Sequence, residues 1–330
     1  MLEIIAEAAQ GYLGDPKKKT LDLVDFASAA KADAIKFQLV YSDELCTNDY
    51  IHHELFTRLE MGNAEWHSVA SKCMEKGIHL YLDIFGIKSL RLACELSVKG
   101  IKLHSTDILN KPLLQAVAAS SVPRVILSAG GTFLSELKEA VSILGNKELI
   151  IMHGFQGYPT MSADNQLDRI RVFQKDFPER NIGFADHVPE DDDKRCWFSA
   201  IAIGMGVTVL EKHITSATVC KDEDHESALN PDNFAQYCKN MRIACSAIGS
   251  SVNSNDFGMS QSEYEYRRKM KKHVIARRDL AAGELISETD LELKRTSAMG
   301  NVVQDSEKII GQRLRNSKLK NQAFFIEDIE

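Results

Sequence analysis

The sequence has few of the features that mark secreted, disulfide-stapled or zinc-ribbon proteins. Its seven cysteines are an odd number, lie scattered, and form no CxxC pair. A disulfide framework or a zinc ribbon needs closely paired cysteines, so we expect reduced, inert thiols in a cytoplasmic protein. The N-terminal segment MLEIIAEAAQ has no basic stretch ahead of an apolar one and does not predict a signal peptide.

Long apolar runs and an excess of positive charge are missing as well. No apolar run reaches about 18 residues, the length that a membrane-spanning helix needs, so we expect no membrane segment. The formal net charge of −7 argues against a nucleic-acid-binding surface. What is present is 44% apolar and 26% charged residues in a chain of 330. These proportions are typical of a globular protein with one barrel-sized domain and one small domain.

Short β-branched runs alternate with longer amphipathic stretches through most of the chain. The predicted strands cover residues 2–8, 34–39, 78–84, 100–103, 124–128, 149–153, 182–185 and 207–211. The predicted helices cover residues 20–31, 64–76, 88–99, 111–120, 133–144, 164–177, 192–205 and 231–248. Eight strand–helix units make a closed (β/α)8 TIM barrel the expected fold. The alternative is an open doubly wound sheet, which the missing glycine-rich turn after the first strand disfavours.

The C-terminal part of the chain differs in composition from the predicted barrel. Residues 249–262 read GSSVNSNDFGMSQS and, being rich in Ser and Asn, indicate a linker. The basic run RRKMKK at 267–272 is interpreted as a solvated helix end or linker and not as a site for an anionic partner. We therefore expect a barrel over 1–250, a linker over 251–272 and a small separate domain over 273–330.

Polar side chains gather at the predicted carboxyl ends of the strands, which face one mouth of a parallel barrel. They are Glu7, Lys36, Gln38, Asp83, Lys102, Ser105, Ser128, His153, Gln156, Asp186, His187, Glu211, Lys212 and His213. Burying an unpaired charge costs several kcal/mol. These groups are therefore expected to pair with one another, bind ions or face a polar cavity.

One part of this set is suited to bind anions. Lys36 and Lys102, with the hydroxyls of Ser105 and Ser128, can hold a phosphate and a carboxylate. The structural alternative is that Lys36 pairs with Glu7 across the barrel.

Another part is suited to bind a metal. His187 and His213, with nearby carboxylates, can hold Mn²⁺, Fe²⁺, Co²⁺ or Zn²⁺ and leave open positions for a substrate. The structural alternative is that each histidine is only hydrogen-bonded within the fold.

A series of motifs runs in order along nearly the whole chain. They are IAEAAQGYLGD, DAIKFQ, GIKLHSTDILNKPLLQAVA, PRVILSAGG, IIMHGFQGYPT, IGFADH and LEKHIT, and then KRT and IIGQRLRNSKLKNQAFFIEDI near the C-terminal end. In this order they resemble the sialic acid synthase family, the N-acetylneuraminate synthase-like enzymes. Residues 273–329 are similar to the antifreeze-like (SAF) domain of that family.

The resemblance implies a (β/α)8 barrel with a C-terminal SAF domain, in a homodimer whose SAF domains each cover the partner's active site. The implied reaction condenses phosphoenolpyruvate with an aldose, typically an N-acetylated amino sugar. Its products are phosphate and a 2-keto-3-deoxy sugar acid of the sialic or nonulosonic type. A divalent metal would hold the open-chain aldehyde, with Mn²⁺ as the expected ion and Mg²⁺ or Co²⁺ as alternatives. Neither a nucleic acid nor a membrane is an expected partner.

The resemblance also implies roles for individual residues, carried over by position. The metal ligands would be His187 and His213, and the catalytic residues Glu211, which handles a proton or orients a water, and Lys102. Phosphoenolpyruvate would be bound by Lys36, Lys102, Ser105 and Ser128. The remaining substrate-binding residues would be Glu7, Asp83, Gln156, Tyr158, Asp224 and, reaching the partner's site, Arg295.

The chain departs from the family pattern around the substrate. Asp83 stands where a threonine near the phosphate is expected, and its charge would repel that phosphate. Gln156 stands where an asparagine or small polar residue is usual, and Ala185 replaces a serine beside the first metal histidine. The metal pair, both lysines and Arg295 are intact. The sequence thus indicates a divergent member with an unusual acceptor or an altered donor.

Three hypotheses follow from this comparison. The first is a metal-dependent, phosphoenolpyruvate-condensing synthase. The second keeps the barrel but uses a different carboxylate donor or lyase-type chemistry. The third is a non-catalytic binding homologue, against which the intact Glu211, His187, His213 and Lys102 argue.

Overall fold

The computed structural model describes residues 2–154, 157–216, 225–249, 255–298 and 300–330. The chain divides into two compact units, Met1–Gly249 and Ser250–Glu330, and each is described by itself. Among the helices described, none combines the length and the apolar content that crossing a bilayer requires.

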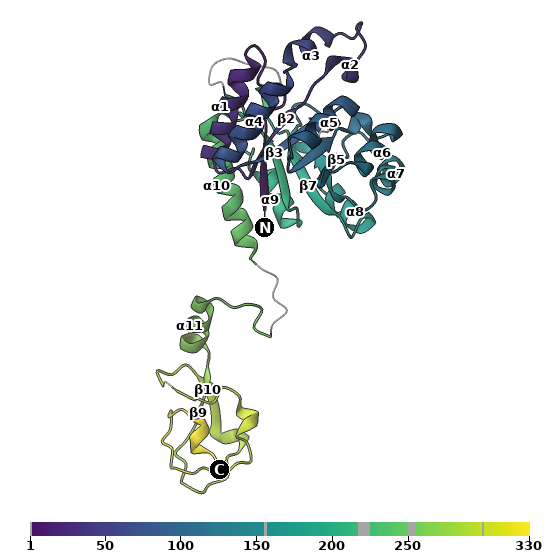
Figure 1. Cartoon of the computed structure of the whole chain (residues 1–330). Helices are drawn as coiled ribbons and strands as arrows, with labels where there is room; N and C mark the ends of the chain where they lie inside the picture. The colour runs from purple at the N-terminus through teal and green to yellow at the C-terminus, as the bar shows by residue number, and fades with distance from the viewer. Residues whose placement is uncertain (1, 155–156, 217–224, 250–254, 299) are drawn as a thin grey trace. The chain divides into compact units, whose positions relative to one another are not determined.

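The N-terminal unit is a closed parallel barrel whose strands follow one another in sequence order, with β8 pairing back to β1 (Figure 1). The strands are β1 (Glu3–Glu7), β2 (Ala34–Gln38), β3 (His79–Ile84), β4 (Gly100–Leu103), β5 (Arg124–Ser128), β6 (Glu148–Gly154), β7 (Asn181–Asp186) and β8 (Val209–His213). Helices connect successive strands and cover the outside of the barrel. The predicted (β/α)8 TIM barrel is confirmed.

The helices of this unit lie close to their predicted positions. They are α1 (Pro16–Ala29), α2 (Ser42–Leu45), α3 (His53–Leu59), α4 (Asn63–Lys76), α5 (Ile87–Glu95), α6 (Lys111–Ala119), α7 (Leu134–Leu144), α8 (Arg169–Asp176), α9 (Trp197–Gly204) and α10 (Pro231–Ile248). Gly77 ends α4 in the left-handed conformation, with φ 66°, as its position predicts. Helix α8 begins later than predicted because Gln166, with φ 45°, interrupts the helical backbone before it.

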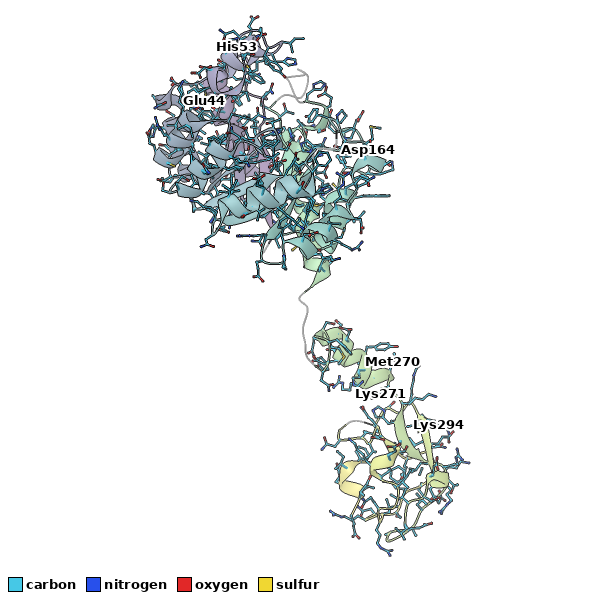
Figure 2. All side chains as sticks on the ribbon, turned by 90° about the vertical axis from the view of Figure 1, so that its right-hand side faces the viewer. Glu44, His53, Asp164, Met270, Lys271 and Lys294 are labelled. Atoms are coloured by element: carbon cyan, nitrogen blue, oxygen red, sulfur yellow. The ribbon has the colours of Figure 1, made fainter. Side chains whose placement is uncertain are left out.

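Two short helices, α2 and α3, are absent from the sequence-based prediction. Each is too short to show a helical repeat of apolar residues. Glu44 of α2 accepts hydrogen bonds from the backbone N–H of Lys88, at 2.5 Å, and Ser89, at 3.0 Å, in the first turn of α5. Figure 2 labels Glu44 and His53 on these two helices. The α2 segment therefore holds the loop that follows β3.

Alternate residues of each strand point into the barrel and form a small apolar layer there. This layer consists of Ile5, Ala34, Tyr81, Ile126, Ile150, Met152, Ala185 and Val209. Side chains along a strand repeat with a period of two, so the residues two positions further on point the same way. Glu7, Lys36, Asp83, Ser128 and Glu211 therefore stand above this layer, at the carboxyl ends of the strands.

The opposite end of the barrel is closed by a polar cluster. Tyr81 donates a hydrogen bond from its hydroxyl to Glu3 Oε1 at 2.8 Å. Arg124 Nη1 contacts Glu3 Oε2 at 2.6 Å and the Tyr81 hydroxyl at 2.9 Å, and Arg124 Nε donates to Glu148 Oε1 at 2.8 Å. These contacts satisfy the charges at the end of the barrel away from the mouth.

The last helix of the barrel is tied to the first strand. Arg242 of α10 donates to the Leu2 carbonyl and to Asp33 Oδ2, each at 2.5 Å. Between the strands and helices lies the main hydrophobic core. There Trp66 packs edge-on against Phe37 and Tyr12.

The C-terminal unit has its own small core around two antiparallel strands, β9 (His273–Ala276) and β10 (Leu291–Lys294). Before them runs α11 (Gln261–Met270), a helix within the segment expected to be a linker. Its last turn carries Arg267, Arg268 and Lys269, all exposed, which agrees with the interpretation of the basic run as a solvated helix end. Figure 2 labels Met270, Lys271 and Lys294 on this unit.

Candidate active site

Five charged side chains from five strands meet inside the mouth of the barrel. They are Glu7, Lys36, Asp83, Lys102 and Glu211, none more than 6% exposed. The strand register pairs Glu7 with Lys36, Asp83 with Lys102 and Glu211 with Ile5. The prediction that these strand ends share one mouth is thereby confirmed for this set.

The Lys36 ammonium group lies among three carboxylates. Its Nζ is 2.7 Å from Asp83 Oδ2 and 3.7 Å from Glu211 Oε2, and it forms an ion pair with Glu7 Oε2. Burial opposes the charge, but the three carboxylates together raise the pKa of Lys36 above its usual range. Lys36 therefore stays protonated. The alternative that Lys36 pairs with Glu7 is confirmed, but the two residues lie on neighbouring strands and not across the barrel.

Glu211 is the ionised carboxylate of the mouth. Its Oε1 accepts a hydrogen bond from Lys102 Nζ at 2.6 Å. Burial alone would raise its pKa, but Lys102 and Lys36 lower the pKa of Glu211 to about 2. A carboxylate held ionised next to two ammonium groups is a weak base, but it can accept a hydrogen bond from a water or a substrate hydroxyl and so orient it.

The pKa of Glu7 is shifted in the opposite direction from that of Glu211. Its Oε1 accepts a hydrogen bond from the Ala9 backbone N–H at 2.7 Å. Burial, and the negative charges of Asp83 and Glu211, outweigh Lys36 and raise the pKa of Glu7 to about 8. At neutral pH the mouth thus holds one carboxyl group that keeps its proton and one that has lost it.

Three buried carboxylate oxygens in the mouth have no hydrogen-bond partner. They are Glu7 Oε2 and Glu211 Oε2, which both form ion pairs with Lys36, and Asp83 Oδ1. A buried acceptor without a partner costs about 1–3 kcal/mol, so such atoms in a folded protein need an explanation. All three residues line the mouth, and a bound ligand there would supply the missing hydrogen bonds.

Two imidazoles lie together at the rim. The rings of His187 and His213 are 5.1 Å apart between centroids, and the ring of Tyr158 lies 5.8 Å from the first and 5.6 Å from the second. Burial, reinforced by Lys102, lowers the pKa of His187 to about 4. Burial and the neighbouring His187 lower the pKa of His213 well below its usual value. Both imidazoles are therefore neutral at pH 7.

The backbone holds the His187 ring in place. Its Nδ1 lies 3.1 Å from the Ala185 carbonyl. The His187 carbonyl accepts hydrogen bonds from Thr160 N–H at 2.8 Å and from Ser227 Oγ at 2.6 Å. The loops after β6 and β8 thus fix the strand end that carries His187.

The two imidazoles are the described residues best suited to hold a divalent metal. Neutral imidazole is the form that coordinates metal ions, and the unpartnered Oε2 of Glu211 adds a carboxylate oxygen nearby. Outside residues 217–224, which the structure does not describe, no group of three or more His, Cys, Asp or Glu side chains has metal-binding geometry. The two imidazoles are thus the donors that the described structure brings together, and they would leave the other ligand positions of a metal to water or substrate.

Ala185 leaves no room for a side chain on the neighbouring strand. Gly154 at the end of β6 has φ 144°, and a Cβ atom added to it would lie 2.8 Å from Ala185 Cβ and closer still to the Ala185 carbonyl. Gly154 of β6 and Ala185 of β7, the residue that stands where a serine is usual, therefore pack against each other in one tight contact.

Three strand-end residues expected at the mouth face the helices instead. His153 packs against Phe173 and Phe184. Asp186 and Lys212 form a completely buried ion pair at 3.0 Å between the barrel and helices α9 and α10. Each of these three residues is adjacent in sequence to a residue that points into the barrel. Because side chains alternate along a strand, the three point outward.

The remaining predicted site residues are distributed as follows. Ser128 is buried at the end of β5, and Ser105 is half-buried in the turn after β4. Gln156 and Asp224 lie outside the described residues. Arg295 is exposed in the C-terminal unit, where its Nε donates to the Met270 carbonyl at 3.2 Å.

The sequence analysis missed His104, which follows Lys102 by two positions and so shares its direction. Burial and the neighbouring Lys102 lower the pKa of His104 to about 4, so the ring is neutral. The alternation Gly100–Lys102–His104 is the signal that would have identified it.

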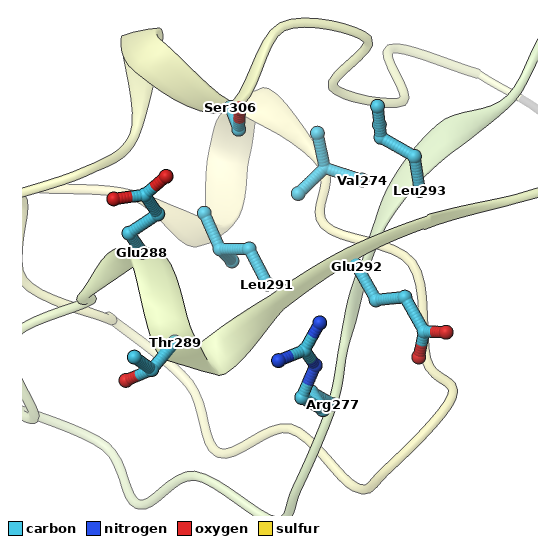
Figure 3. A pocket seen from close by; sticks show the side chains of 8 residues that line it. All are labelled: Val274, Arg277, Glu288, Thr289, Leu291, Glu292, Leu293 and Ser306. Atoms are coloured by element: carbon cyan, nitrogen blue, oxygen red, sulfur yellow. The ribbon is translucent and has the colours of Figure 1, made fainter.

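The C-terminal unit contains a separate hollow of about 440 Å³ beside β10 (Figure 3). The figure shows Arg277, Glu288, Thr289 and Glu292 on its rim, and the first three are exposed to solvent. An open rim of solvated side chains does not make a built site, so the barrel mouth remains the candidate.

Comparison with protein families divides the chain into the same two parts. The profile of the NeuB family matches residues 23–253, and the profile of the SAF domain matches residues 271–330.

Individual relatives match along most of the chain. The N,N'-diacetyllegionaminic acid synthase of Legionella pneumophila is 27% identical, over 99% of this chain and 94% of its own. The N-acetylneuraminate-9-phosphate synthase of Homo sapiens is 25% identical, over 94% of this chain and 88% of its own.

Solved structures agree with these relatives. The N-acetylneuraminic acid synthetase of Leptospira borgpetersenii, solved with citrate, is 29% identical over 82% of this chain and 92% of its own, with a TM-score of 0.72. A protein from Chromobacterium violaceum, described as a putative spore coat polysaccharide biosynthesis protein E, has a TM-score of 0.82 over the whole of both chains. At 20% identity, this second likeness supports the fold alone.

Proposed function

Since the chain belongs to the NeuB family of sialic acid synthase-type enzymes, we propose that its barrel condenses phosphoenolpyruvate with an N-acetylated amino sugar. The products would be a 2-keto-3-deoxy sugar acid of the nonulosonic type and phosphate. The observation that carries the proposal is the meeting of Lys102, ionised Glu211 and two neutral imidazoles at one barrel mouth. This is the place where parallel barrels carry out chemistry.

A divalent metal, most simply Mn²⁺, would be held by His187 and His213, with Mg²⁺ or Co²⁺ as alternatives. When bound, such an ion polarises the oxygen of the open-chain aldehyde. Neutral imidazoles at pH 7 and the free Glu211 Oε2 support this assignment.

The protein's own groups would position the donor and handle protons. Lys102, Ser105 and Ser128 would bind the phosphate and carboxylate of phosphoenolpyruvate, while Lys36, completely buried among carboxylates, would not contact them directly. Carbon 3 of phosphoenolpyruvate forms a bond to the aldehyde carbon, whose oxygen takes up a proton to become a hydroxyl. Water adds to carbon 2, and the bond between carbon 2 and the phosphate oxygen breaks. Glu211, ionised at neutral pH, would orient this water and relay the proton it loses to the aldehyde oxygen, and the hydroxyl left on carbon 2 would give its proton to the departing phosphate as the keto group forms.

The sugar would occupy the outer part of the mouth. Its contacts would come from Glu7, Asp83, Gln156, Tyr158 and Asp224. In a homodimer, the SAF domain of one subunit would cover the barrel mouth of the other, with Arg295 reaching towards the acyl group of the sugar.

The test is phosphate release by the purified full-length protein with Mn²⁺, phosphoenolpyruvate and a panel of N-acetylated hexoses. We expect release with at least one sugar. His187→Ala should lower it about 100-fold or more, because even outer-shell substitutions around metals cost 10- to 100-fold. The matched control is His79→Ala, at the exposed far end of β3. No release with any sugar would refute the proposal.

A second candidate uses the same barrel with a different carboxylate donor or a lyase-type reaction. The ion pair between Asp83 and Lys36 favours it, because this pair withdraws positive charge from the donor site. Calorimetry with phosphoenolpyruvate separates the two, since micromolar binding would exclude a changed donor.

A further inference from the structure

The five charged groups of the mouth leave no surplus positive charge for an anion. Glu7, Asp83 and Glu211 face Lys36 and Lys102, so there are three carboxylates for two ammonium groups. Even with a proton on Glu7, the other two carboxylates balance both lysines. Among the charged side chains described in the mouth, the charge of both lysines is thus matched by carboxylates before a ligand enters.

Asp83 is the residue that completes this balance. Its Oδ2 accepts a hydrogen bond from Lys36 Nζ at 2.7 Å, and it is 2% exposed. Its other oxygen, Oδ1, has no partner. With Asp83 removed from the count, Lys36 would keep its contact with Glu7 and a more distant Glu211 Oε2 at 3.7 Å. The net charge of the five groups would then rise by one unit, which favours an anionic ligand.

The free Oδ1 of Asp83 has a defined chemical preference. An ionised carboxylate oxygen accepts hydrogen bonds and repels anions. A hydroxyl or ammonium group of a substrate would satisfy it, and a phosphate oxygen would not.

We propose that Asp83 sets the charge selectivity of this mouth. Its carboxylate balances the positive charge of Lys36, so that Lys36 does not attract the phosphate. The anion is then bound by Lys102, Ser105 and Ser128. The Oδ1 atom of Asp83 accepts a hydrogen bond from a donor group of the substrate. This inference rests on the proposed function for the place where substrates bind. It deepens that function by naming a neutral or cationic group as the neighbour of Asp83.

The experiment is calorimetric titration of the full-length protein with phosphoenolpyruvate and, separately, with pyruvate at one ionic strength. Asp83→Asn keeps the shape and removes the charge, and Asp83→Thr is a second variant in case the first folds poorly. Each should bind phosphoenolpyruvate on the order of 10- to 100-fold more tightly than the parent, since one repelling unit charge is removed nearby. Pyruvate, which lacks the phosphate, should gain no more than about threefold.

A second substitution tests whether the effect passes through Lys36. Lys36→Met leaves the Asp83 charge without a counterion, so it should weaken phosphoenolpyruvate binding in the parent protein. In the Asp83→Asn background, where both charges of the pair are then absent, it should cancel the gain and return the affinity to near the parent value. The matched control is Asp25→Asn, which removes the same charge from an exposed helix site beside Lys72 and Lys76. It should leave both affinities unchanged.

The outcomes separate the inference from the function. Equal phosphoenolpyruvate affinity in parent and Asp83→Asn, or equal gains for both ligands, would overturn the inference and leave the proposed function standing. Tighter binding in the variants without phosphate release by the parent from any sugar would support the inference and overturn the proposed function. No binding of phosphoenolpyruvate by any variant would overturn both.

Discussion

The buried ion pair between Lys212 and Asp186 offers a sharp test of how the barrel holds its histidines. The two residues are register partners on β7 and β8, each directly before one of the histidines. Lys212 Nζ donates to Asp186 Oδ1 at 3.0 Å and to the Val188 carbonyl at 2.9 Å. Replacing Lys212 with Met keeps the length of the side chain and leaves the Asp186 charge buried without a counterion.

The expected loss is about 3–5 kcal/mol, the usual cost of removing one partner from a buried pair. Ser199 Oγ, at 2.6 Å from Asp186 Oδ2, and the Val188 N–H, at 3.0 Å from Oδ1, still solvate the carboxylate. These two hydrogen bonds favour a loss of stability in the lower half of that range. For a unit of this size the loss corresponds to a fall in Tm of about 10 °C. Urea unfolding followed by circular dichroism measures the free energy directly.

A matched pair on the surface provides the control. Lys194 and Asp193 approach to 2.6 Å but are 46% and 83% exposed. Lys194→Met should therefore leave the free energy of unfolding nearly unchanged. Adding Asp186→Asn to Lys212→Met should recover part of the loss, because it removes the uncompensated charge. If Lys212→Met costs no more than Lys194→Met, the assignment of this pair as a buried lock is wrong.

Three further predictions follow from the geometry. Between pH about 6.5 and 8 the folded protein keeps a proton on Glu7 that the unfolded chain has lost. The free energy of unfolding should therefore fall by on the order of 1–2 kcal/mol as the pH rises through this range. Urea unfolding at pH about 6.5 and at pH about 8 measures this fall, and Glu7→Gln should remove it. Arg124→Met should cost about 2–3 kcal/mol by leaving Glu3 without its ion pair, while phosphate release per folded molecule stays unchanged, since Arg124 lies at the end of the barrel away from the mouth. Gly154→Ala should cost at least about 2 kcal/mol, because it combines a positive φ with a clash against Ala185, and an unchanged urea midpoint would contradict this.

Much of the barrel could be predicted because each strand is a short, mostly apolar run with a polar residue at or near its carboxyl end. The period of two then carries Glu7, Lys36 and Asp83 to one mouth once the strands are known to be parallel. Helix α10 shows the strongest agreement, with the same bounds in the prediction and in the structure. Its Pro at the first helical position and Gly after its last residue mark both ends.

The rest of the site could not be predicted, because it depends on tertiary contacts that no local sequence pattern encodes. At Asp186–His187 and at Lys212–His213, two polar residues follow one another. Only the position of the inner apolar layer decides which of each pair turns inward. The charge of Asp83 was predicted to repel phosphate, but its pairing with Lys36 depends on two strands meeting in register. Glu44 of α2 caps α5 although it lies about 45 residues earlier in the chain, and no local sequence pattern predicts that contact.

The pairing of β1 with β8 has a consequence for how this chain is made. β1 leaves the ribosome early, and its second neighbour, β8, follows about 200 residues later. At about 5–20 residues per second, one edge of β1 stays without a partner for on the order of 10–40 seconds of translation. During that time the strand edge presents free backbone groups and the apolar sequence EIIAE to other nascent chains. The ring of charges at the mouth is therefore completed only at the end of barrel synthesis, when Glu211 and His213 arrive together.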